Sequence, residues 1–330
     1  PIDSLREHGV MSLKTRFGNF ANVLDEGHTQ KGALVLDSPI ITNREWKAII
    51  QYFDEAAQII DCTFDVKGGV TALSDALERI KRDAEDAGRE GRGHLFLTDE
   101  NISKDRASIP MILATGGLHT HLVAKGLRTF TSLNVRSAEC MDTHYFAVLV
   151  GVGATTINAY LSLDALADRH EKGLFKGMSL DDCIVKACEA VDQGLLKIIS
   201  KMGISVISSY RGGVNFEALG LSRALVAEFF PGMPTKISGI GLAGIQQQVL
   251  SQHKTAFASS NISALPIGGL YRYRNGEETH AFDGQLIHIL QNAVTTNNYA
   301  KYLSYAKGLY NLPPISLRDL LGFKKAEKTI

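Results

Sequence analysis

The sequence has few cysteines, no excess of charge of either sign and no long apolar run. Its 330 residues include four cysteines, one tryptophan and eight prolines. So few thiols in so long a chain are typical of a reducing compartment, so we expect a cytoplasmic protein with free cysteines. The 35 basic and 35 acidic residues leave no positive field for nucleic acid or anionic lipid. The longest apolar run, residues 147–154, is far shorter than the ~20 residues that span a bilayer. These absences argue against nucleic acid and membranes as partners.

The cysteines and histidines do not show the spacing of a metal site. No two cysteines form a CxxC pair, and no three are close enough in sequence for an iron–sulfur cluster. His119 and His121 flank Thr120 in a predicted helix, about 200° apart, so they cannot face one metal ion. A metal site there would need a third ligand such as His144 from the next helix. We therefore interpret His119 and His121 as polar histidines of the core or of an interface.

What the sequence does have is a regular alternation of short apolar runs with longer amphipathic segments. This pattern is typical of a parallel sheet with flanking helices, so we predict an α/β fold. The predicted strands are residues 58–66, 94–98, 128–135, 154–157 and 204–208, with a possible edge strand at 34–36. The predicted helices between them are residues 70–90, 110–125 and 142–150, and a long helix that begins after Ser179.

After Gly213 the pattern becomes helical, and no clear strand returns to the sheet. Short helices are predicted at residues 216–219, 222–229, 241–253 and 316–321, two more lie within 287–310, and 259–275 is predicted to be irregular. We expect three parts: a connector (1–45), a central α/β domain (46–295) and a helical segment (296–330). The absence of a methionine before Pro1 suggests either processing or a piece cut from a longer chain.

The sharpest candidate for a binding site is the turn formed by Tyr210, Arg211, Gly212 and Gly213. It follows a predicted strand and precedes a predicted helix, which is where α/β sheets bind ligands. Two glycine amides and a guanidinium could hold an anion there. The alternative is that Arg211 pairs with a buried carboxylate or with a neighbouring domain. The glycines at 151 and 153 are interpreted instead as a tight turn from helix to strand.

Many segments, in one order along nearly the whole chain, resemble the central domain of the glutamate synthase large subunit and of ferredoxin-dependent glutamate synthase. Thr120 interrupts what is often a run of histidines in that family, and Gly213 and Met233 also depart from its pattern. The matching segments are residues 11–13, 36–40, 144–149, 153–154, 158–161, 194–198, 200–204, 209–212, 216–221, 239–241 and 317–321, together with Arg128.

The resemblance implies a truncated β/α-barrel-like domain that joins two active sites. In that family an N-terminal cysteine hydrolyses glutamine, ammonia passes to 2-oxoglutarate, and FMN with a 3Fe-4S cluster supplies electrons. None of these reactive parts maps onto this chain, since Pro1 is not the cysteine nucleophile. We therefore expect no cofactor and no catalytic residue in this chain.

The resemblance implies a scaffold that joins the glutaminase and synthase domains and helps shape the ammonia path. The larger enzyme would make L-glutamate from L-glutamine and 2-oxoglutarate. The partners of the scaffold would be the amidotransferase and FMN-binding domains of the same chain, with ferredoxin or a pyridine-nucleotide-dependent small subunit as electron donor. The location would be the cytoplasm of a bacterium or the stroma of a plastid. The alternative is an independent α/β enzyme or anion-binding module that uses Arg211, Gly212 and Gly213.

Overall fold

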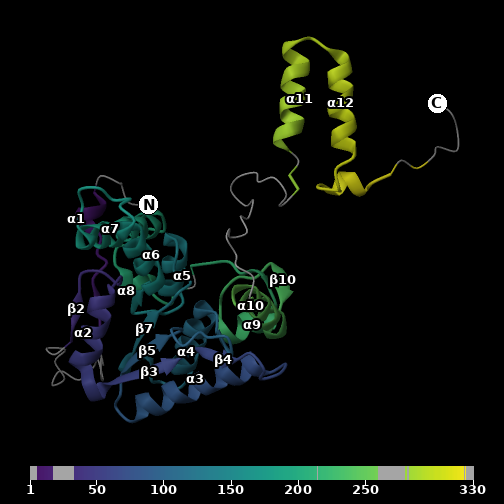
Figure 1. Cartoon of the computed structure of the whole chain (residues 1–330). Coiled ribbons are helices and arrows are strands. Elements are labelled where there is room, and N and C mark those ends of the chain that lie inside the picture. The colour runs from purple at the N-terminus through teal and green to yellow at the C-terminus, as the bar shows by residue number, and fades with distance from the viewer. Residues whose placement is uncertain are drawn as a thin grey trace. The chain divides into compact units, whose positions relative to one another are not determined.

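A computed structural model of the chain describes residues 6–17, 33–213, 215–258, 279–280, 282–322 and 324 (Figure 1). The chain divides into two compact units, residues 1–258 and 259–330. The boundary expected between residues 295 and 296 falls inside the second unit, because the helices on its two sides pack against each other. The segment predicted to be irregular, 259–275, lies outside the described residues. None of the described helices combines the length and the apolar composition needed to cross a bilayer.

The centre of the first unit is a four-stranded parallel sheet. Its strands are β3 (Ala57–Asp61), β5 (His94–Thr98), β7 (Ser132–Arg136) and β8 (Thr156–Asn158), paired in that order. All three pairings are parallel and in sequence order, as in one arc of a β/α barrel. The predicted α/β class is confirmed, and each of these four strands overlaps a predicted one. The strand predicted at 128–135 begins later than expected, because residues 128–130 form the short helix η3 (Arg128–Phe130).

Three helices cover one face of this sheet. They are α3 (Ala72–Arg89), α4 (Met111–Ala124) and α5 (Thr143–Gly151), and they follow β3, β5 and β7 in the chain (Figure 1). The apolar stripe of α3 is buried, as its helical spacing predicts. Leu95 and Leu97 of β5 belong to the same core as this stripe, so alternate residues of the strand face these helices.

The other face of the sheet packs on α2 (Asn43–Phe53), where Trp46 meets Phe96 edge to face at 5.1 Å. Thr42 and Glu45 form a capping box that starts this helix. On this face a ladder of polar side chains crosses the strands in register: His94 bonds to Ser132, Thr156 to Asn134, and Arg136 to Asn158.

The predicted strand 58–66 is divided in two at Cys62. Its second part, β4 (Thr63–Asp65), leaves the sheet and pairs antiparallel with β6 (Arg106–Ser108). Asp61 accepts hydrogen bonds from the backbone amide and the hydroxyl of Thr63, and it forms an ion pair with Arg106. These contacts of Asp61 stabilise the change of direction between β3 and β4.

The predicted strand 204–208 is wrong. The chain makes a single bridge there, between Val206 and Ser12, and helix α8 (Ile207–Tyr210) begins at the next residue. The edge of the sheet beyond β8 is instead occupied by the N-terminal part of the chain, because Ile40 forms a parallel bridge with Ile157.

The predicted helix 216–219 is also wrong. Strand β9 (Leu219–Leu221) begins there and pairs in parallel with β10 (Ile237–Ile240) as a separate small sheet. The amide of Ala218 donates to the carbonyl of Pro234, which keeps this segment extended. The helices predicted on its C-terminal side are confirmed as α9 (Arg223–Phe229) and α10 (Leu242–Ala256).

The remaining elements of the first unit are mostly short. The long helix predicted after Ser179 is confirmed, and Ser179 begins it with a capping box. These elements are α1 (Glu7–Val10), β1 (Thr15–Arg16), β2 (Val35–Leu36), η2 (Asp54–Ala56), η3 (Arg128–Phe130), α6 (Tyr160–Glu171) and α7 (Leu180–Lys201). β2 pairs with β1, in agreement with the predicted edge strand.

The second unit contains a helical hairpin, α11 (Gly284–Thr295) and α12 (Tyr299–Tyr310), followed by the short helix η4 (Leu317–Leu320). Asn297 adopts a φ of 46° in the turn, and the side chain of Asn298 caps α12. The two helices approach closely at Gly308, where a Cβ would lie 2.5 Å from a methyl carbon of Leu286. The pair of helices predicted within 287–310 is therefore confirmed.

Candidate functional site

His119, on α4, occupies the centre of the candidate site. Nε of Arg128, which follows α4 after the turn at Gly126, donates to its Nδ1 at 3.1 Å. Burial and the charges of Arg128 and Arg211 lower the pKa of His119 to about 4, so the imidazole is neutral near pH 7. Because Nδ1 accepts a hydrogen bond, the ring proton of this neutral form is on Nε2.

The guanidinium of Arg128 also organises the turn between α5 and β8. Its Nη2 donates to the carbonyl of Gly153 at 2.8 Å, and its Nη1 to that of Thr131 at 2.6 Å. Arg211 reaches the next residues of the same turn, with Nε donating to the carbonyl of Ala154 at 2.9 Å. The two arginines therefore hold adjacent carbonyls before β8.

Arg211 also ties the turn to the N-terminal part of the chain. Its Nη2 donates to Oγ1 of Thr15 at 2.5 Å, and that hydroxyl donates to the carbonyl of Thr155 at 2.9 Å. The Nε and Nη2 of Arg211 thus both donate to acceptors inside the protein. No carboxylate of the described residues forms an ion pair with Arg128 or Arg211.

The pKa values of both arginines are lowered, and no carboxylate in the described part of the chain is paired with either of them to offset this. Burial lowers the pKa of Arg128, and the nearby positive charge of Arg211 lowers it further. Burial likewise lowers the pKa of Arg211. Both groups remain charged near neutral pH, because a guanidinium starts from a very high pKa.

Two glycines allow the backbone to approach the imidazole. A Cβ on Gly153, whose φ is 126°, would lie 2.6 Å from the ring of His119. A Cβ on Gly212, whose φ is 69°, would lie 2.9 Å from Nε2 of the same ring. The structure therefore brings together His119 and Gly212, which the sequence analysis considered separately.

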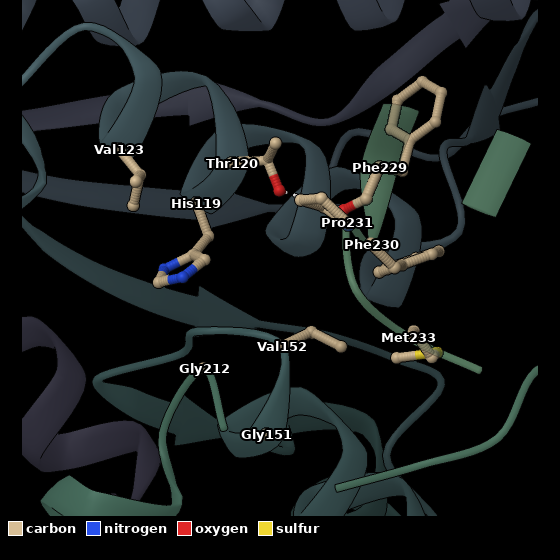
Figure 2. Close-up of a pocket in the computed structure, with 10 residues that line it drawn as sticks. All are labelled: His119, Thr120, Val123, Gly151, Val152, Gly212, Phe229, Phe230, Pro231 and Met233. Atoms are coloured by element: carbon tan, nitrogen blue, oxygen red, sulfur yellow. Dashed lines mark hydrogen bonds between the residues drawn. The ribbon is translucent and has the colours of Figure 1, made fainter. Parts of the chain in front are cut away.

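A cavity of about 230 Å³ opens beside His119 and Gly212 (Figure 2). Most of its other lining is apolar, and the hydroxyl of Thr120 is occupied by the carbonyl of Phe229 at 3.1 Å. The apolar lining residues are Val123, Val152, Phe229, Phe230, Pro231 and Met233.

The other residues singled out in the sequence lie apart from this cavity. His121 bonds Glu85 of α3 at 2.8 Å, so the two histidines of α4 have different partners. Tyr210 is fully buried, edge to face with Phe216 at 6.2 Å, and the amide of Gly213 donates to the carbonyl of Tyr210. Tyr210 and Gly213 therefore shape the turn and do not line the cavity.

A second polar cluster lies at the carboxyl ends of β5 and β7. Asp99 is buried and accepts from the amide of Ala138 at 3.0 Å, and burial raises its pKa to about 6. Glu139 accepts from the amide of Met111 at 2.8 Å and from the hydroxyl of Tyr145. These carboxylates fix the loops that lead into α4 and α5.

Sequence reasoning did not select Arg128, Asp99 or Glu139 as site residues. The available signal was position: Arg128 starts a predicted buried strand, and the two acids follow strands, where α/β sheets place polar groups. The cysteines are free, and among the described residues no three His, Cys, Asp or Glu side chains come together as a metal site would require.

A family model described as "Glutamate synthase central domain" matches residues 1–222. The chain is 56% identical over 330 residues to the glutamate synthase [NADPH] large chain of Azospirillum brasilense, covering 100% of this chain and 22% of that protein. It is 35% identical over 335 residues to the chloroplastic ferredoxin-dependent glutamate synthase of Spinacia oleracea, covering 98% and 21%. With the glutamate synthase [NADPH] large chain of Bacillus subtilis the identity is 33%, covering 100% and 21%. The chain thus spans about a fifth of the length of these relatives.

Proposed function

Because the chain belongs to the glutamate synthase central domain family, we propose that it joins the glutamine-hydrolysing and glutamate-forming domains of a glutamate synthase large chain. In this proposal it is a scaffold that keeps the two sites in register and shields the path of ammonia between them. The larger protein makes L-glutamate from L-glutamine and 2-oxoglutarate, and this chain contributes no reacting group.

The observation that carries this proposal is the apolar surface of the second unit. Two helices in a hairpin have little interior of their own, and within α12 no residue is buried. Tyr299 and Tyr302 stack at 5.8 Å on this surface. Many exposed apolar side chains on so small a unit are typical of a docking surface. The exposed residues are Val294, Tyr299, Tyr302, Leu303, Leu309, Tyr310, Leu317, Leu320 and Leu321.

The internal contacts of the candidate site support a structural role. Arg128 and Arg211 hold the carbonyls of Gly153 and Ala154, and His119 accepts from Arg128. Arg211 donates to Ala154 and Thr15 of this chain, and such internal contacts do not support an independent enzyme that uses the turn at 210–213.

The cofactors and partners follow from the same proposal. We assign FMN and the 3Fe-4S cluster to the part of the larger protein outside this chain, and the described residues assemble no set of three cysteines for a cluster. The amidotransferase and FMN-binding domains are the proposed partners, with ferredoxin or a pyridine-nucleotide-dependent subunit as the electron donor. The proposed location is the cytoplasm of a bacterium, or the plastid stroma in a plant or alga.

The test is the coupling between the two half-reactions in the full-length protein that carries this chain. Tyr302→Ser and Leu303→Ser change exposed side chains of α12, so the first unit should keep its fold. We expect glutamine hydrolysis to persist, while the glutamate formed per glutamine hydrolysed falls and free ammonia appears. Val70→Ser, at a residue 88% exposed in the first unit, is the matched control and should leave the ratio unchanged. An unchanged ratio in both hairpin variants would contradict the role of this surface.

A further inference from the structure

Arg128 and Arg211 form a pair of partly buried positive charges, and no carboxylate of the described residues forms an ion pair with either of them. Buried charges in proteins are nearly always paired, because removing an ion from water costs more than a neutral hydrogen bond returns. Here the acceptors are the carbonyls of Gly153, Ala154 and Thr131 and the hydroxyl of Thr15. Among the described residues these two charges have neutral acceptors and no counter-charge.

We propose that the site receives an acidic side chain, with an apolar side chain beside it, from a neighbouring domain of the larger protein. The carboxylate faces Arg211 and His119, and the apolar side chain fills the cavity next to them. This inference rests on the proposed function and specifies one docking point of the scaffold.

The polar half of the docking point is formed by donors that have no acceptor of their own. Nη1 of Arg211 makes no hydrogen bond with any described residue, although its Nε and Nη2 do. The Nε2–H of neutral His119 is a second donor, since Nδ1 is occupied by Arg128. His119 lines the cavity, so a carboxylate can approach the ring from the cavity side (Figure 2).

The apolar half favours a protein segment over a small dissolved anion. The cavity of about 230 Å³ is lined by Phe229, Phe230 and Met233 (Figure 2). Val123, on its rim, is 55% exposed, so the apolar surface extends beyond the cavity. A small anion would neutralise the arginines but would leave this surface in water, whereas an acidic and an apolar side chain together satisfy both halves.

The length of the relatives shows where such a segment can come from. The chain covers 22% of the Azospirillum brasilense large chain, so most of a protein of that size lies outside residues 1–330. A segment of one of its other domains is the occupant that the proposal names, and a free carboxylate or inorganic anion is the alternative that the experiment separates from it.

The experiment places a photo-reactive benzophenone side chain at position 123 of the full-length protein. Val123 lines the cavity but takes no part in the hydrogen bonds of the arginines, so the change leaves them in place. Mass spectrometry should find cross-links to a segment outside residues 1–330 that contains Asp or Glu next to an apolar residue. The same probe at Val185, 53% exposed on α7, is the control and should not reach that segment.

The charge requirement is tested on the partner side, where the folding of this chain is not at risk. Replacing the acidic residue of the cross-linked segment by its amide should lower the cross-linking yield about tenfold, because the attraction between the carboxylate and Arg211 is then lost. An unchanged yield, or cross-links only within residues 1–330, would overturn the proposal. If added acetate or phosphate lowers the yield of the amide variant and the unaltered protein equally, the site binds a dissolved anion and the proposal also fails. Cross-links at another place, with coupling still lost in the hairpin variants, would reject this docking point and leave the proposed function standing.

Discussion

The substitution Gly153→Ala tests the geometry of the candidate site through stability. The added Cβ would lie 2.6 Å from the ring of His119, where Arg128 holds the imidazole in place. Real Cβ atoms do not approach that closely, so either the ring or the turn before β8 must move. The backbone is strained as well, since φ at this residue is 126°.

The expected cost combines these two effects. Strained backbone at a non-glycine residue costs roughly 1–3 kcal/mol. Forcing an extra methyl group into a packed site costs a further ~1–3 kcal/mol. We therefore expect Gly153→Ala to lower the free energy of unfolding by about 4 kcal/mol, a large share of the stability of a typical domain, which is ~5–15 kcal/mol.

The assay is urea unfolding followed by the fluorescence of Trp46, the one tryptophan of the chain, which is buried in the first unit. Gly126→Ala is the matched control: its φ is 69°, and a Cβ there would meet nothing within 4 Å. The control should lose only about 1 kcal/mol.

A double-mutant cycle isolates the contact with the ring. In a His119→Ala background, Gly153→Ala should cost roughly 1–3 kcal/mol less, because the space that the ring occupied is free. Equal losses for Gly153→Ala and Gly126→Ala, or no coupling between positions 153 and 119, would refute the packing of His119 against this turn.

Three further predictions concern pH and local stability in the same unfolding assay. Burial raises the pKa of Asp99 from 3.8 to about 6, so the folded state binds a proton that the unfolded chain releases. Stability from this group therefore falls as the pH rises from about 4 to 6, by roughly 3 kcal/mol, and Asp99→Asn should remove that fall. His119 has the opposite effect on stability, because burial lowers its pKa from 6.5 to about 4. Stability from this group therefore rises as the pH rises from about 4 to 6.5, and His119→Gln should remove that rise. Thr42→Ala should cost about 1 kcal/mol by removing the capping bond to the amide of Glu45, and no loss would contradict the capping box.

Local sequence pattern predicted the central α/β part of this fold well. The strand 94–98 and the stripe of α3 depend on residues that are close in sequence, so their periodicity is visible without the fold. The strand predicted at 204–208 failed for the opposite reason. Its apolar residues suit a strand, but the edge of the sheet is taken by Ile40, which lies far earlier in the chain.

The candidate site was predictable only in part. Gly153 could be interpreted as a turn residue, and the two histidines of α4 as belonging to different surroundings, from spacing alone. The partners of Arg211 could not be predicted, because Thr15 lies 196 residues away and its hydroxyl carries no local signal. The contact of Arg128 with His119 likewise depends on the chain reversing at Gly126, which places a residue beyond the helix back against it.

The central claim is that this chain connects active sites without forming one. The most direct measurement compares glutamine hydrolysis and bound flavin in the isolated 330-residue chain and in the full-length protein, at equal molar concentration. A cooperative urea transition of Trp46 fluorescence shows beforehand that the isolated chain is folded. We predict that the folded isolated chain is colourless and does not hydrolyse glutamine, while the full-length protein does. Turnover of glutamine by the isolated chain, or one FMN bound per chain, would contradict the account.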